Sequence, residues 1–467
     1  MTAALFLFAQ GWILSYLIGH RHGQGRRGLR AILDALAFAP AIGLGGASLV
    51  FVAAGLAGIT PPSGWHLVAF SALPGAGLLL LSRPAAGSAL EKPFSSPPRW
   101  LVAALILLVG ASAWMVGRAD ARNPRGGYDA IAIWQVSARI LEGAPTRAGT
   151  ILRAIPPSHH GDYPGLLPGA FAATWHVEGA DSPSAQTFVL ALFGLGLLAA
   201  LWRAVDRVSG PTAACCAVIV LASTPELLIY LHLQYVDPIV AYLLLLALDG
   251  FAQELEERPM TSPLLTGFAF GLMPWAKNEG VALAVLLLLV FLGGVAMRRR
   301  SEILRRLRPM AAGAFLPLAV HLLFKTLWAP PNDMLRNLHS TWSQLTDASR
   351  WRRVARGFGE EWNPLRGFKR WGAAWLILPM ALLGTRRERL KRSGTLMAAA
   401  FVLLALAAWF GVYLLSYADL DWHIPTSLHR LLLQVYPAAL LAAIWWGWPE
   451  NGDAGAAEEE KEWGAQD

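Results

Sequence analysis

Hydrophobic residues gather into long runs along this chain, and short polar segments that carry most of the charge separate them. A run of about 20 apolar residues is long enough to cross a bilayer as a helix. The pattern predicts spans near residues 3–19, 31–57, 64–82, 100–117, 185–202, 211–229, 238–252, 309–328, 372–384, 394–417 and 428–447, with a broken pair within 264–294. The sequence therefore predicts an all-α polytopic membrane protein of about 13 transmembrane helices.

The stretch 264–294 is too long for one span. Pro274, Lys277, Asn278 and Glu279 interrupt its apolar residues. Proline removes a helical hydrogen bond, and charged groups avoid the bilayer core. We therefore expect two shorter helices that meet at a turn.

Basic residues predict the orientation of the spans, because short loops rich in Lys and Arg stay in the cytoplasm. Residues 20–30 hold four arginines, and residues 297–308 hold six. Alternating the spans from these loops places the N-terminus outside and the C-terminus in the cytoplasm. The first apolar run has no basic n-region and no small-residue cleavage site, so it is interpreted as a retained span.

Composition supports the membrane class. Hydrophobic residues make up 55% of the chain and charged residues 15%, whereas soluble proteins carry about 25% charged residues. The short alternating segments of a β-barrel are absent. The net charge of +8 is explained by basic cytoplasmic loops, so no nucleic-acid partner is predicted. Cys215 and Cys216 are adjacent in an apolar run, which favours core residues over a metal site or a disulfide.

The predicted organisation has five parts. They are three N-terminal helices with a cytoplasmic linker (1–99), a transmembrane core (100–328) with a first long outer loop (118–184), a second outer segment (329–371), C-terminal helices (372–448) and a disordered acidic tail (449–467). The second outer segment combines four tryptophans with the basic residues Arg336, Arg350, Arg352, Arg353, Arg356, Arg366, Lys369 and Arg370. An interfacial helix facing anionic lipids and a solvated basic loop both fit this mixture.

Four predicted outer turns bring ionisable groups to one face of the membrane. Such groups at span ends are costly unless they are paired or face water, so a functional site is predicted there. The turns contribute Asp129, His159, His160 and Asp162; His232, Gln234, Tyr235 and Asp237; Lys277, Asn278 and Glu279; and Asp419, Asp421, His423, His429 and Arg430.

Asp129 begins a segment with helical apolar spacing that continues to Leu141 and is stopped by Gly143 and Pro145. An Asp at a helix start commonly caps backbone N–H groups. An ionised carboxylate there is also what a general base requires. The two interpretations are compatible.

Residues 159–164, with the sequence HHGDYP, form a dense polar turn. His159, His160 and Asp162 have the side chains of metal ligands, but adjacent histidines usually point apart. A substrate-binding turn that includes Tyr163 and a purely structural turn remain as alternatives. No residue is assigned to a metal, and no cofactor is predicted; a divalent metal is compatible with the site but not required.

Lys277 and Arg430 are the candidate ligands for a phosphate. A lysine at a membrane boundary often only extends to the interface, but next to Asn278 and Glu279 at a helix break it is expected to face a cavity. Arginine binds phosphate with two hydrogen bonds, and lysine adds a point charge. Asp237, Asn278 and Glu279 are expected to contact substrate.

Five motifs occur in one order along the chain: GYDAIAIWQVSARIL, HGDYPGLLP, LQYVDPIVAYLLLLAL, PWAKNEG and TSLHRLLLQVYP. Together they resemble a bacterial branch of the GT-C glycosyltransferases, similar to dolichyl-phosphate-mannose protein mannosyltransferases and lipid A aminoarabinose transferases. The resemblance covers roughly residues 100–440, and its specificity comes from the ordered set.

The resemblance implies a GT-C-type bundle with two long non-cytoplasmic loops, in a bacterial inner membrane, with the active site on the periplasmic face. The donor would be a sugar on a polyprenyl phosphate, and the acceptor a hydroxyl of a glycan, lipid or protein. Asp129 matches the family's catalytic base. Many members carry a second acid directly after it, where this chain has Ala130, so Asp162 becomes the candidate second catalytic acid.

Two other classes of protein share some of these features. A transporter or flippase would use a discontinuous helix such as 264–294, but the break maps to an outer end and is not repeated in the other half. A non-enzymatic subunit would not need carboxylates, histidines and cations from four turns on one face. The sequence therefore predicts a membrane glycosyltransferase, with a transporter or flippase as the alternative.

Overall fold

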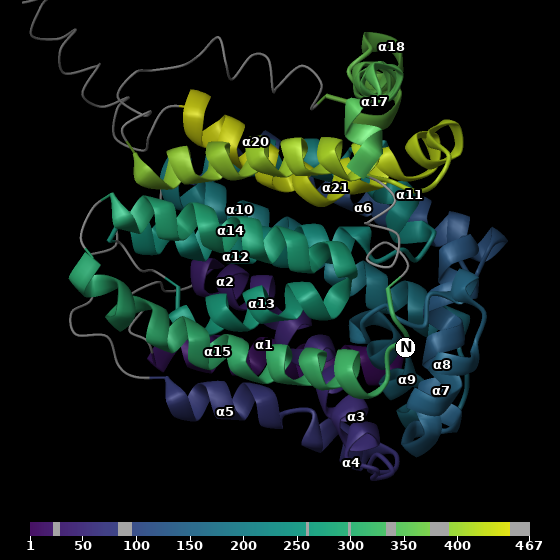
Figure 1. Cartoon of the computed structure of the whole chain (residues 1–467). Helices are drawn as coiled ribbons and strands as arrows, with labels where there is room; N and C mark the ends of the chain where they lie inside the picture. Colours follow the sequence, from purple (N-terminus) through teal and green to yellow (C-terminus); the bar gives the residue numbers. More distant parts are fainter. Residues whose placement is uncertain are drawn as a thin grey trace, which may run out of the picture.

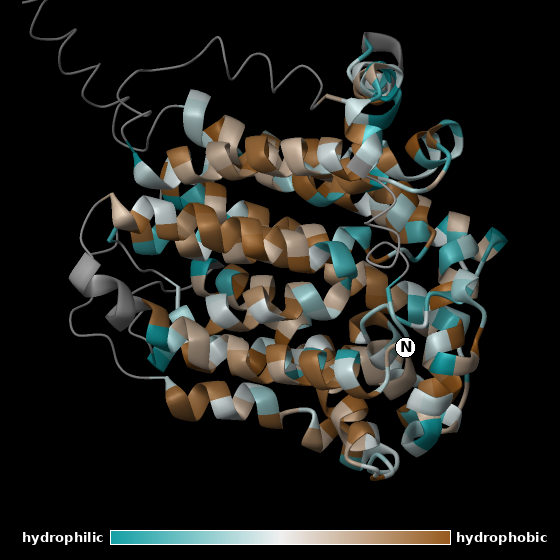
Figure 2. Cartoon of the chain, viewed as in Figure 1, coloured by the Kyte–Doolittle hydropathy of each residue, from teal (hydrophilic) through white to brown (hydrophobic). Residues whose placement is uncertain are grey.

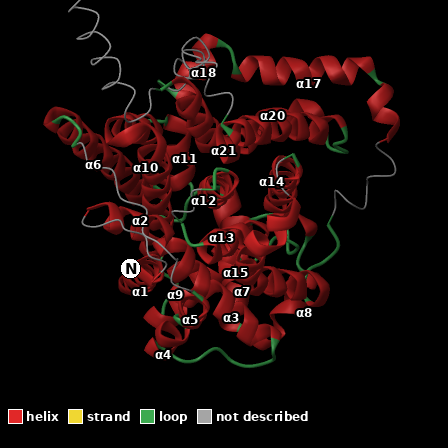
Figure 3. Cartoon of the chain, turned by 90° about the vertical axis from the view of Figure 1, so that its left-hand side faces the viewer, coloured by secondary structure: helices red, strands yellow, loops and turns green. Residues whose placement is uncertain are grey.

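The computed structural model describes residues 1–21, 29–82, 96–257, 261–297, 300–332, 342–373 and 392–448. Every regular element within these ranges is helical (Figure 1, Figure 3). Nine helices of this described part are long and apolar enough to cross a membrane. The prediction of an all-α polytopic membrane protein is confirmed at this level.

The long helices follow the predicted spans closely. They are α1 (Thr2–Arg21), the continuous α2 (Leu29–Pro40), η1 (Ala41–Gly45) and α3 (Gly46–Leu56), then α6 (Arg99–Arg122), α10 (Pro183–Ala222), α12 (Asp237–Leu255), α14 (Asn278–Ala296), α15 (Arg300–Leu327), α20 (Ser393–Leu414) and α21 (Leu420–Gly447). Shorter apolar helices are α4 (Trp65–Phe70), α5 (Leu73–Leu81) and α13 (Pro263–Ala276). Most of the span predicted near 372–384 lies outside the described residues, so the count of thirteen stays a prediction.

The helix α10 contains the predicted span 185–202 and most of the next one, 211–229, because the chain reverses inside it. Gly210 has φ 84° and ψ 172°, a conformation that is essentially restricted to glycine, and Pro211 then starts the second half in the position where proline is favoured. Beyond the second half and α11 (Pro225–His232), the Gln234 amide donates to the Thr187 hydroxyl near the start of α10, at 2.9 Å. The two halves therefore run antiparallel.

The long helices lie side by side, with short helices across one end of the bundle (Figure 1). Figure 2 shows hydrophobic residues concentrated along the long helices. The short helices are η2 (Ala130–Gln135), α7 (Val136–Gly143), η3 (Pro145–Arg147), α8 (Ala148–Ala154), η4 (Pro157–His159) and α9 (Leu166–Glu178). We call the end of the bundle that they cover the loop end. The Met1 amino group pairs with Glu178, so the N-terminus also lies at the loop end.

A buried ionic network holds the opposite end of the bundle together. Arg203 and Arg207 of α10 both pair with Asp249 of α12, at 2.9 and 2.8 Å. Arg203 also lies 3.2 Å from Asp34 of α2, and Arg207 lies 3.3 Å from Glu256. Buried charges are tolerated only when they are paired in this way. These basic residues, which the sequence marks as a span boundary, therefore also connect three helices.

The second outer segment contains the helices α17 (Ala348–Glu361) and α18 (Pro364–Trp371), after the short η5 (Trp342–Thr346). The axis of α17 crosses the long helices, so it is seen nearly end-on in Figure 1 and along its length in Figure 3. The Arg350 guanidinium is buried and donates to the carbonyls of Leu414 and Tyr413, at 2.7 and 2.9 Å. Arg336 and the side chain of Arg366 lie outside the described part of the chain.

Candidate functional site

Asp129 lies at the start of η2, but its side chain makes no capping hydrogen bond. Its Oδ2 atom is instead 2.6 Å from Nη2 of Arg430 on α21. The capping interpretation of this carboxylate is therefore wrong. The ion pair joins two residues that are about 300 positions apart in the chain, and it brings the first and last of the predicted outer turns into contact.

The backbone before Asp129 holds it against the turn that follows α11. Gly126 has φ 74°, and a Cβ at this position would lie 2.6 Å from the carbonyl oxygen of Leu233. The Gly127 N–H donates to the same carbonyl at 2.9 Å, and the Asp129 N–H donates to the Tyr235 hydroxyl at 3.4 Å. A residue without a side chain is needed here for this close approach.

Asp237, at the start of α12, is the buried centre of the site. Its side chain is completely inaccessible to solvent. It accepts from the Lys277 ammonium at 3.0 Å, the Arg430 guanidinium at 3.2 Å and the Gln434 amide at 2.6 Å. Two cations and an amide therefore compensate one buried carboxylate. The buried charge is tolerated only while these three partners remain in place.

Arg430 connects Asp237 with Asp129, since one guanidinium contacts both carboxylates. The guanidinium also lies 4.6 Å from the centre of the Tyr235 ring, in a cation–π contact. The side chains of Arg430 and Asp129 each keep 15% exposure. They therefore form the accessible side of the cluster, with Asp237 behind them.

Lys277 lies between α13 and α14, where the predicted helix break occurs. Its side chain is only 4% exposed and pairs with Asp237 and, at 2.8 Å, with Glu279. The ammonium turns inward to these carboxylates, so the alternative of a lysine extending to the interface is wrong. Glu279 keeps 24% exposure and lies on the accessible side.

Asp162 of the HHGDYP turn is buried and accepts from two amides, those of Asn278 and Asn332, at 2.7 and 2.8 Å. The Lys325 ammonium donates to the Asp162 carbonyl at 2.5 Å and to the Asn278 side-chain oxygen at 2.6 Å. These bonds fix the turn to the ends of α14 and α15. The network places Asp162 beside Asn278, one residue from Lys277.

The rest of the turn packs against η2. His159 Nδ1 lies 2.7 Å from the Ala132 carbonyl, and the His160 ring stacks on Tyr163 at 4.7 Å. Burial, followed by the negative charge of Glu279, raises the pKa of Tyr163 well above its ordinary value; Asp162 and Asp129 act in the same direction, against Arg430. The Tyr163 phenol therefore keeps its proton at neutral pH and is available as a hydrogen-bond donor.

The network unites most of the residues predicted for the site, and it adds some that sequence reasoning missed. His159 and His160 contribute through a backbone contact and a ring contact. Lys325 was missed although an ionisable residue in the last turn of an apolar span is itself a signal. The other additions are Asn332 and Gln434. Of the last predicted turn, Asp419 accepts from the Asp421 N–H and His423 contacts Ser416.

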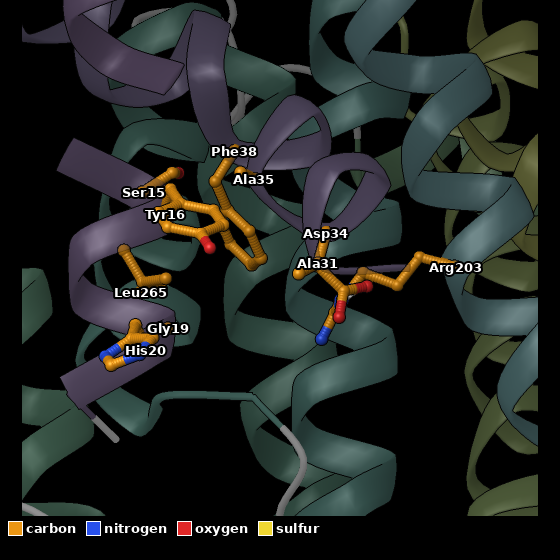
Figure 4. A pocket seen from close by; sticks show the side chains of 10 residues that line it. All are labelled: Ser15, Tyr16, Gly19, His20, Ala31, Asp34, Ala35, Phe38, Arg203 and Leu265. Atoms are coloured by element: carbon orange, nitrogen blue, oxygen red, sulfur yellow. Dashed lines mark ion pairs between the residues drawn. The ribbon is translucent and has the colours of Figure 1, made fainter. Parts of the chain in front are cut away.

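The cavity shown in Figure 4 lies apart from this cluster. Within the described ranges, no group of three His, Cys, Asp or Glu side chains is arranged to hold a metal ion. The cavity is lined by residues that include Tyr16, His20, Asp34 and Arg203 (Figure 4). His20, in the last turn of α1, lies about 28 Å along the helix from Met1, so this cavity lies towards the opposite end of the bundle.

Comparison of the chain with protein-family models, curated proteins and solved structures found no match. The resemblance to GT-C glycosyltransferases therefore stays an expectation from the motifs. The function has to be argued from the chemistry of the cluster around Asp129, Asp237, Lys277 and Arg430.

Proposed function

We propose that the protein is a membrane glycosyltransferase that moves a sugar from a polyprenyl-phosphate donor to an acceptor hydroxyl at the loop end. The observation that supports this most directly is the contact between the Asp129 carboxylate and the Arg430 guanidinium, beside the buried cation Lys277. Glycosyl transfer needs a base for the incoming hydroxyl and positive charge for the departing phosphate. The cluster offers both groups next to each other.

Asp129 is the base in this proposal. A general base must lie within hydrogen-bond reach of the proton that it takes. Oδ2 contacts Arg430, and we assign Oδ1 to the acceptor hydroxyl. The hydroxyl proton passes to Asp129 while the acceptor oxygen bonds to the anomeric carbon. The bond from that carbon to the phosphate oxygen breaks, and the lipid phosphate leaves with the electron pair, with inversion at the sugar.

Arg430 and Lys277 bind the donor phosphate in this proposal. Both cations contact Asp237, which holds them in place and balances their charge before the donor arrives. Arg430 presents a planar donor group suited to two phosphate oxygens. Glu279 and the protonated Tyr163 phenol, which lie nearby, contact the sugar.

Asp162 receives a positioning role here, which differs from the second catalytic acid expected from the sequence. Its carboxylate already accepts from Asn278 and Asn332. A carboxylate held by two amides is poorly placed to take a substrate proton. It fixes the turn that carries His159, His160 and Tyr163 against α14.

The test uses purified protein in liposomes, a panel of synthetic polyprenyl-phosphate sugars and extracts of cell-envelope acceptors. Asp129→Asn is expected to reduce release of polyprenyl phosphate by at least about 100-fold, with an unchanged unfolding midpoint. Asp181→Asn is the matched control, since this carboxylate also pairs with two arginines, Arg125 and Arg139, outside the cluster. Its activity should equal that of the wild type.

Full activity of Asp129→Asn would contradict the mechanism. Movement of intact donor across the liposome membrane, with no cleavage of the sugar–phosphate bond, would instead favour the transporter or flippase alternative. Mass spectrometry of cell-envelope glycans, lipids and glycoproteins with and without the chain would identify the sugar and the acceptor.

A further inference from the structure

The helix α17 has an apolar face that packs on the bundle. Val354 is completely buried on this face, and Phe358 contacts the rings of Phe410 and Tyr413, with centres 5.3 and 6.4 Å apart. A Cβ at Gly357 would lie 2.6 Å from the Ile424 side chain. Together with the Arg350 contacts to the end of α20, these contacts fix which side of α17 faces the protein.

The opposite side of α17 carries unpaired positive charge. Arg352, Arg353 and Arg356 are exposed. At about 100° per residue, Arg352 and Arg356 point away from the face that contains Val354. In the described part of the molecule, none of these three arginines forms an ion pair. Large exposed aromatic side chains accompany them on α17, α18 and the turn between, namely Trp351, Trp362 and Phe368.

The position of α17 matches the headgroup level of a bilayer. Arg350 fixes the helix to the carbonyls at the C-terminal end of α20, and a span ends where the hydrocarbon core ends. The helix crosses the spans and lies at the edge of the bundle (Figure 1, Figure 3). A helix in this orientation lies in the membrane plane, and the side turned away from α20 faces lipid.

We propose that the surface formed by α17 and α18 binds the anionic phospholipid headgroups of the membrane in which the protein sits. Arginines form strong hydrogen bonds with phosphate oxygens, and indole rings are favoured at the membrane interface. Three unpaired arginines beside exposed aromatic side chains are typical of an interfacial helix that binds anionic lipids. This inference does not depend on the glycosyltransferase proposal, because it uses none of the residues around Asp129.

Hydrogen–deuterium exchange of the full-length protein in nanodiscs tests this inference locally. Backbone amides of residues 348–371 are compared in phosphatidylcholine alone and with phosphatidylglycerol added. Exchange is expected to be at least about fivefold slower with the anionic lipid, and the difference should shrink at high salt because the attraction is screened.

The variant Arg352→Gln/Arg353→Gln/Arg356→Gln should lose the difference between the two lipids. A matched control, Arg118→Gln/Arg122→Gln/Arg147→Gln, removes the same charge from exposed positions elsewhere and should keep the difference. Equal exchange in both lipids, or a lipid effect that survives in the first variant, would overturn the inference. So would protection by soluble inorganic polyphosphate in phosphatidylcholine discs with no response to anionic lipid.

Discussion

Asp237 is the residue on which the charged side chains of the site converge. It is inaccessible to solvent, and its partners come from α21 and from the break between α13 and α14. The sequence identifies Asp237 as a site residue only as an acid at the end of a polar turn, where a span begins. The compensation by Lys277, Arg430 and Gln434 exists only because the helices bring these residues together, and the stability of the loop end depends on it.

Asp237→Ala is expected to lower the free energy of unfolding by about 3 kcal/mol, at the lower end for a broken buried ion pair. The decrease is limited because Lys277 keeps its ion pair with Glu279 and Arg430 keeps its ion pair with Asp129. Asp181→Ala removes an exposed carboxylate that also contacts two arginines, and should cost no more than about 1 kcal/mol. Unfolding in mixed micelles measures the free energy of unfolding of both variants. An equal decrease in the two variants would show that burial of the carboxylate does not determine the size of the effect.

The reversal inside α10 shows how much a single element depends on backbone chemistry. Gly210 adopts a conformation that residues with a side chain avoid, and Pro211 then begins the second half. The sequence predicts two spans on either side of this pair, and the structure confirms two helical halves there. The reversal brings Thr187 to Gln234 and so places the turn that contains Tyr235 next to Asp129.

Gly210→Ala is expected to lower the free energy of unfolding by about 1–3 kcal/mol, because alanine is strained at this φ and ψ. Gly411→Ala is the matched control, since this glycine is helical and a Cβ there would meet no atom within 4 Å. It should be neutral or slightly stabilising. The same unfolding measurement compares them, and a neutral Gly210→Ala would mean that the turn adapts without strain.

At the scale of the whole molecule, one end of the bundle holds the short helices and the Asp129 cluster, and the opposite end holds the Arg203 and Arg207 network. The chain crosses between them repeatedly, so each loop belongs to one of two faces. The arginine-rich segment after α14 continues from Met297, about 28 Å along the helix from Asn278. The positive-inside rule therefore predicts that the loop end faces away from the cytoplasm.

Cysteine labelling tests this orientation in a Cys215→Ala/Cys216→Ala background. Thr146 and Met297 are exposed at the loop end and the opposite end. In sealed right-side-out vesicles, an impermeant maleimide should label Thr146→Cys directly and Met297→Cys only after permeabilisation. The reverse pattern, or labelling of both positions from one side, would show that the predicted orientation is wrong.

The sequence by itself determined the helical class, the approximate limits of most spans and the residue types gathered at their ends. These features depend on local hydrophobicity and length, which any stretch of chain carries in its own residues. Asp129, Lys277 and Arg430 could be singled out because ionisable residues are conspicuous beside apolar runs. The short apolar helix α9, with Leu166 and Phe171 buried, was not predicted, because it lies within a stretch interpreted as a loop.

Only the tertiary structure decided which of these residues are partners. Asp129 contacts Arg430, Asp237 compensates two cations, and Lys325 and Asn332 join Asp162 from a helix end and the segment after it. These contacts join positions separated by 40 to about 300 residues. Such pairing depends on how the helices pack and where each one ends, and no local pattern encodes it. The same packing turned α17 so that Arg352 and Arg356 face away from the bundle while Arg350 contacts it.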